Sequence, residues 1–139
     1  MKKFILKKLE WILVCWTLLI FILCATPGQY IPQISWLELM SFDKLIHAGM
    51  FFVLCLLLIL FSFNHQPSFG IRIIYFFLCL SYGLSLELMQ AYFFTNRTGD
   101  YMDMIANSFG AFIALLSSRK IISFFKPNVE GATKRLYVN

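Results

Sequence analysis

The chain has 139 residues, of which 60% are hydrophobic and only 14% are charged, and its formal net charge is +5 at pH 7. Soluble domains carry about 25% charged residues and 45–50% apolar residues, so this composition excludes an ordinary soluble domain and predicts an integral membrane protein. The positive charge does not indicate nucleic acid as a partner, because the bases lie at the ends of apolar segments rather than along one face. Basic residues at segment ends instead suit membrane topology and anionic lipid headgroups.

The first predicted element is an apolar run that follows a short basic stretch and ends before Pro27. This order of segments is also typical of a cleaved signal peptide. Cleavage after Ala25 would place Leu23 at a position that requires a small residue, and a lipoprotein site at Cys24 would be preceded directly by the same leucine. We therefore expect a retained transmembrane helix over about residues 9–26, which is long enough to span a bilayer.

Three further apolar runs follow, separated by segments rich in proline, glycine and asparagine, which mark turns. They predict transmembrane helices over about 42–63, 71–94 and 100–118. We expect residues 1–125 to form one all-α domain, a bundle of four transmembrane helices. Residues 126–139 are expected to form a polar cytoplasmic tail.

The orientation of the bundle follows from the distribution of basic residues. One set of helix ends carries Lys2, Lys3, Lys7, Lys8, Arg72, Arg119, Lys120, Lys126, Lys134 and Arg135. The opposite ends carry only Lys44 and Arg97. Because cytoplasmic segments are enriched in lysine and arginine, both termini are expected in the cytoplasm, with the chain crossing a cell membrane several times.

Glu87 is the residue that most requires an explanation, because it lies in the interior of an apolar helix. A carboxylate facing lipid costs about 3 kcal/mol even on the lowest scale, and neither a helix cap nor the helix dipole helps it there. We therefore expect Glu87 to face a polar pocket shared with other helices.

Polar residues of the last three helices all fall on the outer side of the membrane. They are Asp43, His47, Glu87, Gln90, Asp100, Asp103 and Asn107. A rise of 1.5 Å per residue puts Glu87 and Asn107 each about 10 Å below the outer ends of their helices. Within each helix the spacing is three or four residues, so the polar side chains share a face. Gly110 continues one of these faces and would permit close helix packing, while Arg97 would cover the acidic group from above.

Each of these residues except Glu87 also has an ordinary structural interpretation. Asp100 and Asp43 could cap helices, and Asp103 could be a first-turn acid that the helix dipole favours. Gln90 and Asn107 are typical of hydrogen bonding between membrane helices, and His47 could be a satisfied packing residue.

Three segments together resemble the VanZ-like membrane protein family. They are DKLIHAGMFFVL at 43–54, SLELMQAYF at 85–93 and NRTGDYMDMIANSFGA at 96–111. The family pattern is matched by Asp43, Lys44, His47, Glu87, Gln90, Arg97, Asp100, Asp103, Asn107 and Gly110. The family often has tyrosine near Phe51 or Phe52. The resemblance covers about residues 10–120 and implies a small polytopic protein of the bacterial cell envelope; the founding member is linked to teicoplanin resistance.

One functional hypothesis is an enzyme that acts on a lipid or a lipid-linked envelope precursor. Its candidate catalytic residues are Glu87, His47 and Asp103. Candidate substrate-binding residues are Asp43, Gln90, Arg97, Asp100 and Asn107. A divalent ion held by Glu87, Asp100 and Asp103 is a further option, and such oxygen ligands suit Mg²⁺ or Ca²⁺ better than zinc.

Two other hypotheses involve no catalysed reaction. The protein could bind and shield an envelope component or the lipid tail of an antibiotic, or the polar residues could form a structural network that locks the helices together. The sequence does not decide between an enzyme and a binding protein, and it does not give the oligomeric state.

Overall fold

The computed structural model describes residues 2–26, 42–62, 67–93 and 100–136, with side chains described over 8–26, 43–62, 67–93 and 100–123. This part of the chain is helical apart from a few residues next to the helix ends. Its elements are α1 (Lys2–Ala25), α3 (Phe42–Phe61), α4 (Phe69–Phe93) and α5 (Tyr101–Leu136). Each helix contains a stretch long and apolar enough to cross a membrane. The prediction of an all-α protein with four candidate membrane-spanning helices is confirmed.

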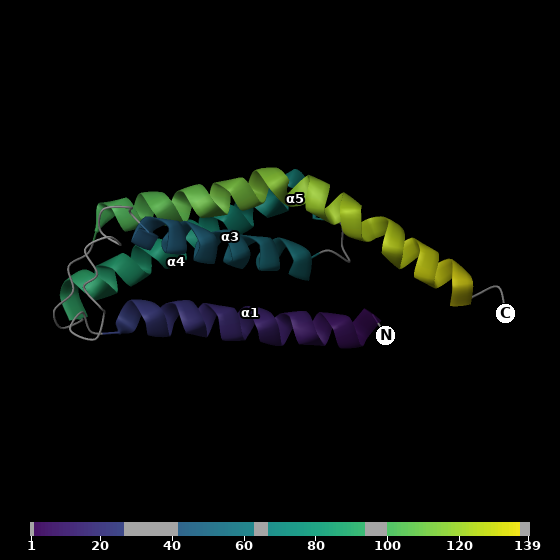
Figure 1. Ribbon diagram of the computed structural model, residues 1–139, viewed down its shortest axis with the longest axis horizontal. Helices are drawn as coiled ribbons and strands as arrows, with labels where there is room; N and C mark the ends of the chain where they lie inside the picture. The colour runs from purple at the N-terminus through teal and green to yellow at the C-terminus, as the bar shows by residue number, and fades with distance from the viewer. Residues whose placement is uncertain (1, 27–41, 63–66, 94–99, 137–139) are drawn as a thin grey trace.

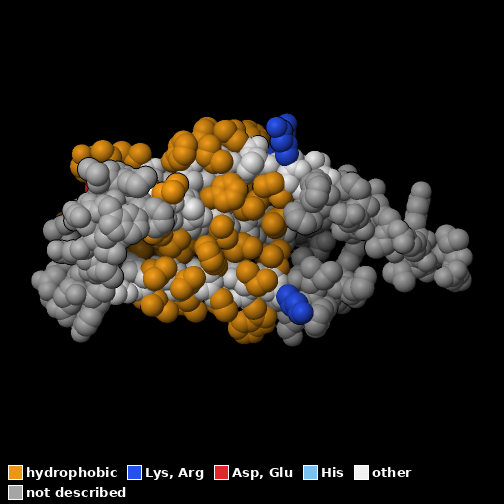
Figure 2. Space-filling view, viewed as in Figure 1, with side chains coloured by type: hydrophobic (Ala, Val, Ile, Leu, Met, Phe, Trp, Pro, Cys, Tyr) orange, Lys and Arg blue, Asp and Glu red, His pale blue; other side chains and the backbone are white. Residues whose placement is uncertain are grey.

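The four helices run alongside one another, with α3 and α4 between α1 and α5 (Figure 1). Both termini lie at the same end of the bundle, as an even number of crossings requires. Their cytoplasmic location stays a prediction. Figure 2 shows hydrophobic side chains over the middle of the visible face, with lysine or arginine side chains at one end of this band. This distribution matches the sequence pattern from which the orientation was inferred.

Local hydrogen bonds explain where two helices begin. The Ser68 side chain accepts a hydrogen bond from the Ile71 backbone N–H at 3.4 Å, and α4 starts directly after this serine. Asp100 accepts a hydrogen bond from the Met102 backbone N–H at 2.8 Å, and α5 starts directly after this aspartate. Both residues act as N-caps, which satisfy backbone donors that have no partner within the helix.

The observed boundaries differ from the predicted ones mainly at the two ends of the chain. α1 begins at Lys2 rather than near residue 9, because the basic stretch contains no residue that breaks a helix. α5 continues to Leu136, so the predicted end near Ser118 was wrong, and residues 126–136 of the expected tail are helical. Pro127 lies in this continuation; a proline inside a helix removes one backbone hydrogen bond and favours a bend rather than a complete stop. Figure 1 shows that α5 changes direction in its second half.

Aromatic side chains with polar ends fasten α1 to its neighbours. The Trp16 indole N–H donates to the Met50 carbonyl of α3 at 3.1 Å, and the Tyr82 hydroxyl of α4 donates to the Thr17 carbonyl at 2.8 Å. Buried tryptophan and tyrosine usually find such partners. Together with the buried apolar side chains between the helices, which include Phe51, these bonds hold α1 in the bundle.

At the end of the bundle away from Asp100, Arg72 joins α4 to α5. Its side chain is buried, and its guanidinium donates to the Ser118 hydroxyl at 3.2 Å. The guanidinium also lies 5.5 Å from the centre of the Phe69 ring. Arg72 was predicted only to orient the protein, but in the structure it also takes part in helix packing.

α3 and α5 approach each other closely at Gly110. A Cβ atom built on this glycine would lie 2.7 Å from the carbonyl carbon of Ala48 and would overlap its carbonyl oxygen. Only a residue without a side chain fits there, as expected for small residues at contacts between membrane helices. The glycine therefore lets the polar faces of the two helices come within hydrogen-bonding distance.

Replacing Gly110 with alanine should push α3 and α5 apart and lower the free energy of unfolding by about 1–3 kcal/mol, the usual cost of overpacking. The matched control is Gly49→Ala, because a Cβ at Gly49 meets no atom within 4 Å. Thermal unfolding of the purified variants in detergent measures the effect. An equal response of the two variants would contradict the proposed close contact.

Candidate functional site

Lys44 lies at the centre of a group of ionisable side chains where α3 and α5 begin. Its ammonium group donates to Asp43 at 3.0 Å, to Asp100 at 2.6 Å and to Asp103 at 2.5 Å. An ammonium group has three donors, so these three carboxylates use all of them. Sequence analysis treated Lys44 only as a motif residue and a topology signal. The sequence did contain one indication of its role, because Lys44 is one of only two basic residues predicted at the acidic end of the bundle.

His47 is buried beside this lysine, with 7% of its surface exposed. Its Nδ1 lies 3.2 Å from Oδ1 of Asn107. Because an amide oxygen can only accept, Nδ1 carries the proton and donates it to this bond. The other ring nitrogen, Nε2, faces Asp103 at 3.8 Å and Asp43 at 3.9 Å. His47 therefore connects the amide of Asn107 with two carboxylates.

Glu87 faces the interior of the bundle rather than lipid, with 5% of its surface exposed. Its Oε2 accepts a hydrogen bond from the Asp100 backbone N–H at 3.0 Å. This carboxylate thus satisfies a backbone donor just before α5 and joins α4 to the start of that helix. Glu87 lies where the sequence placed it, close to the acidic residues of α5.

Some of the predicted site residues lie together in the structure and others do not. Those that lie together are joined by hydrogen bonds or ion pairs, and we call this group, with Lys44, the polar cluster. Its members are Asp43, Lys44, His47, Glu87, Asp100, Asp103 and Asn107. Gln90 is buried, but its amide donates to the Cys24 carbonyl of α1 at 3.0 Å, which fits the packing interpretation of this residue. Arg97 lies outside the residues that the structure describes.

The polar cluster carries an excess of negative charge. Among its described members, four carboxylates face one ammonium group, which leaves a formal charge of −3 while His47 is neutral. Such an excess at the end of an apolar bundle favours a cation as a further partner, because opposite charges attract one another. An anion would bind there only together with an additional positive charge.

The arrangement of donor atoms shows which residues could share an ion. Asp43, His47 and Asp103 each offer one ligand atom, and these atoms lie within 4.8 Å of one another. Of the metal ligands predicted from the sequence, only Asp103 belongs to this group. Glu87 and Asp100 have other partners, the Asp100 backbone N–H and the Lys44 ammonium respectively.

Asp100 stands just before the membrane-spanning part of α5. The hydrogen bond from the Lys44 ammonium holds the pKa of this carboxyl group below its ordinary value of 3.8, and the bond from the Met102 backbone N–H acts in the same direction. Both bonds favour the ionised form of the carboxyl group. Asp100 therefore stays negatively charged at any pH near neutrality.

Comparison of the chain with protein-family models, with curated proteins and with solved structures gives no match.

The lowered pKa of Asp100 predicts a pH-dependent contribution to stability. Because the folded-state pKa is depressed, this contribution is complete above the ordinary value of 3.8 and is lost as the pH falls through the folded-state value. Asp100→Asn should therefore be less stable than the natural chain near neutral pH, and the difference should shrink below pH 3.8. Thermal unfolding of both proteins across this range is the measurement. A difference that does not change with pH would show that ionisation of Asp100 is not the cause.

Proposed function

We propose that this is a bacterial cell-envelope membrane protein of the VanZ-like type whose polar cluster binds the headgroup of a lipid or a lipid-linked envelope precursor at the outer leaflet. The observation that carries the proposal is the convergence of ionisable side chains from α3, α4 and the start of α5 at one end of the bundle. His47, Glu87 and Asp103 are buried there, whereas Asp43 and Asp100 are partly exposed. Ionisable residues within membrane-spanning segments mark functional sites by default, because their burial is costly. A purely structural network would not need four carboxylates, since buried ion pairs are weak sources of stability.

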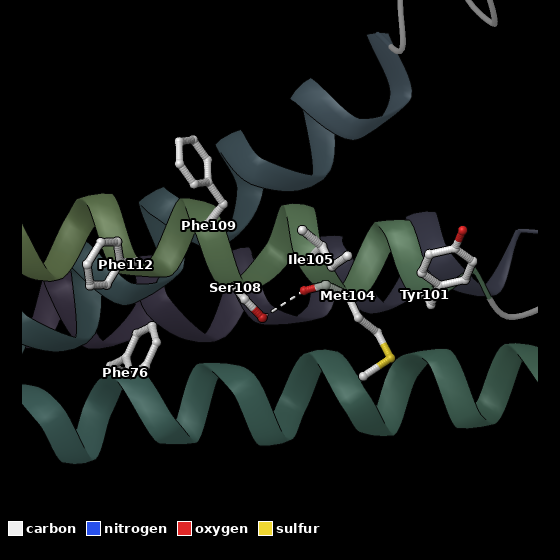
Figure 3. A pocket seen from close by; sticks show the side chains of 7 residues that line it. All are labelled: Phe76, Tyr101, Met104, Ile105, Ser108, Phe109 and Phe112. Atoms are coloured by element: carbon white, nitrogen blue, oxygen red, sulfur yellow. Dashed lines mark hydrogen bonds between the residues drawn. The ribbon is translucent and has the colours of Figure 1, made fainter.

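An apolar groove beside the cluster supports a lipid as the ligand. The groove has a volume of about 580 Å³, and its lining residues are Phe76, Tyr101, Met104, Ile105, Ser108, Phe109 and Phe112. Figure 3 shows that all of these except Phe76 come from α5. From Tyr101 to Phe112 the helix rises about 16 Å, roughly half the hydrocarbon thickness of a bilayer. The groove therefore has the length of one leaflet, and its Tyr101 end lies at the level of Asp100.

A smaller cavity adjoins this groove and reaches one member of the polar cluster, Asn107. It has a volume of about 180 Å³, lies between α4 and α5, and is lined by Gly83 and Asn107 among other residues. Met104 and Ser108 line both hollows, so the two adjoin. A Cβ atom on Gly83 would lie 3.3 Å from the Asn107 amide nitrogen, so the glycine leaves room for this amide beside α4. A lipid with its chain along the groove would have its polar end at Tyr101, next to Asp100, and the middle of its chain beside the smaller cavity.

The described residues favour binding over covalent catalysis. The two serines that adjoin the polar segments of α4 and α5 both donate to carbonyls of their own helix at 2.7 Å, Ser85 to Tyr82 and Ser108 to Met104. Neither is hydrogen-bonded to a base that would activate it, as a serine nucleophile requires. Acid or base work by Glu87 or His47 remains the second candidate, because both side chains are buried beside other ionisable groups.

The resemblance to the VanZ-like family supports the cellular setting of this proposal. The family pattern includes every member of the polar cluster, so the cluster is where a shared family property would reside. We accordingly propose that the protein alters susceptibility to glycopeptide antibiotics such as teicoplanin through an envelope lipid or precursor.

Glu87→Gln tests the role of the cluster's charge. Glutamine keeps the shape of the side chain and an oxygen that can accept the hydrogen bond from the Asp100 backbone N–H, but it carries no acidic group. Hydrogen bonds to charged groups contribute about 1.5–3 kcal/mol, so the effect of the protein on envelope lipids should fall at least about tenfold. The measurement is an inventory of lipids and lipid-linked precursors, together with teicoplanin susceptibility, in cells with no protein, the natural chain or the variant.

The matched control is Glu10→Gln, which makes the same change at an exposed position of α1. Membrane levels of all three proteins are compared by immunoblotting. The proposal would be contradicted if cells with and without the natural chain had the same lipids and precursors in the same amounts. A loss of the variant protein from the membrane would favour the structural network instead.

Ser108→Trp tests the groove, because a large side chain there would fill both hollows. We expect the amount of lipid that copurifies with the protein, counted by native mass spectrometry, to fall severalfold. Leu116→Trp is the control, since Leu116 is an exposed residue of α5 outside the groove. Equal lipid content in the two variants would exclude the groove as the lipid site.

A further inference from the structure

We infer that Asp43, His47 and Asp103 form a binding site for a divalent transition-metal ion. This inference goes beyond the headgroup proposal and does not depend on it. Three observations support it: the spacing of the donor atoms, the orientation of the histidine, and the charge of the surroundings.

The spacing of the donor atoms suits a shared ion better than it suits mutual hydrogen bonds. Nε2 of His47 lies 3.8 Å from Oδ2 of Asp103 and 3.9 Å from Oδ1 of Asp43. Both distances exceed the range of about 2.7–3.2 Å for hydrogen bonds from nitrogen to oxygen. Metal–nitrogen and metal–oxygen bonds are about 2.0–2.2 Å long, so two ligands of one ion lie up to about 4 Å apart. An ion can therefore bridge these atoms once the side chains move closer together, since all three ligand atoms already lie within 4.8 Å of one another.

The histidine is already held in the orientation that a metal ligand requires. Its Nδ1–H donates to the Asn107 side chain, so the lone pair is on Nε2, which faces the two carboxylates. The ring is more than nine-tenths buried, and no hydrogen bond to Nε2 occurs within the part of the chain that the structure describes. Metal-binding histidines almost always donate their other ring N–H in this way, which fixes both tautomer and orientation.

Lys44 holds the two carboxylates by their other oxygens. Its ammonium contacts Oδ2 of Asp43 and Oδ1 of Asp103, whereas Oδ1 of Asp43 and Oδ2 of Asp103 face His47. The lysine therefore orients the two carboxylates through oxygens other than those that face His47. A divalent ion would change the formal charge of the polar cluster from −3 to −1, so the negative surroundings favour its binding.

The ligand set also indicates the class of metal. One imidazole with two carboxylates suits Zn²⁺ or Mn²⁺ better than Mg²⁺, which prefers oxygen ligands alone. This revises the sequence-based expectation of Mg²⁺ or Ca²⁺, which assumed three carboxylates. Three protein ligands leave coordination positions for water or for another ligand.

The test uses the purified full-length protein in detergent, stripped with EDTA and then titrated with Zn²⁺ alone or Mn²⁺ alone. Metal content after gel filtration is measured by mass spectrometry, and affinity by calorimetry. We expect one equivalent of bound metal per chain. Asp43→Asn should weaken binding at least tenfold, and it should fold normally because 60% of the Asp43 side chain is exposed. His47→Gln should weaken binding at least as much, and Asn107→Ala, which removes the orienting partner, by about 10–100-fold.

Glu10→Gln is the matched control, since it removes an exposed carboxylate of α1 that lies outside the polar cluster. Its affinity for metal should stay within a few-fold of the natural chain. Failure of the natural chain to bind a stoichiometric amount of either metal would overturn the inference, as would equal weakening by Asp43→Asn and Glu10→Gln. Lipid copurification measured on the same preparations separates this result from the headgroup proposal, because either can fail alone.

Discussion

The interaction on which the rest of the site depends is the contact of the Lys44 ammonium with three carboxylates. It joins the first turn of α3 to the first turn of α5, because Asp43 belongs to one helix and Asp103 to the other. It also holds the side chain of Asp100, whose backbone N–H is bound by Glu87 of α4. The Lys44 ammonium thus holds together the polar ends of α3, α4 and α5. Without it, the mutual repulsion of the carboxylates would favour separation of these helix ends.

Such short contacts are possible only because the two helix backbones come together farther along. Gly110 lies one turn beyond Asn107 on the same face of α5, and it packs directly against the Ala48 carbonyl of α3. Ala48 follows His47, so the close approach brings the imidazole to 3.2 Å from the Asn107 amide. The glycine and the lysine therefore act together: one removes the steric obstacle between the helices, and the other offsets the charge that would drive them apart.

Much of this arrangement was predictable from the sequence because it depends on periodicity and hydrophobicity. The apolar runs located α3 and α4 to within two residues at each end, and the spacing of Asp103 and Asn107 placed them on one face. Spacing along a helix does not determine which neighbouring helix each side chain contacts. Gln90 shares a face with Glu87, yet its amide reaches α1, because a helix face can contact more than one neighbour.

The central role of Lys44 and the true set of possible metal ligands were missed for a related reason. Sequence spacing shows that side chains lie on a common side, but the pairing of each oxygen depends on rotamers and on the exact offset between helices. Asp103 divides its two oxygens between Lys44 and His47, and Asp43 does the same. The predicted end of α5 was wrong because Arg119 and Lys120 were taken to close the helix, whereas it continues to Leu136.

The charge of the polar cluster links the two proposals in a definite order. A cluster with a formal charge of −3 repels phosphate and carboxylate, which are common headgroup anions, so the described residues alone are poorly suited to bind them. A divalent ion between Asp43, His47 and Asp103 would place two positive charges at the point where the donor atoms converge, and its open coordination positions could accept a headgroup oxygen. For an anionic headgroup, the metal would therefore bind first and the lipid second. For a cationic headgroup the two would compete for the same carboxylates, so the effect of metal on lipid retention distinguishes the sign of the ligand's charge.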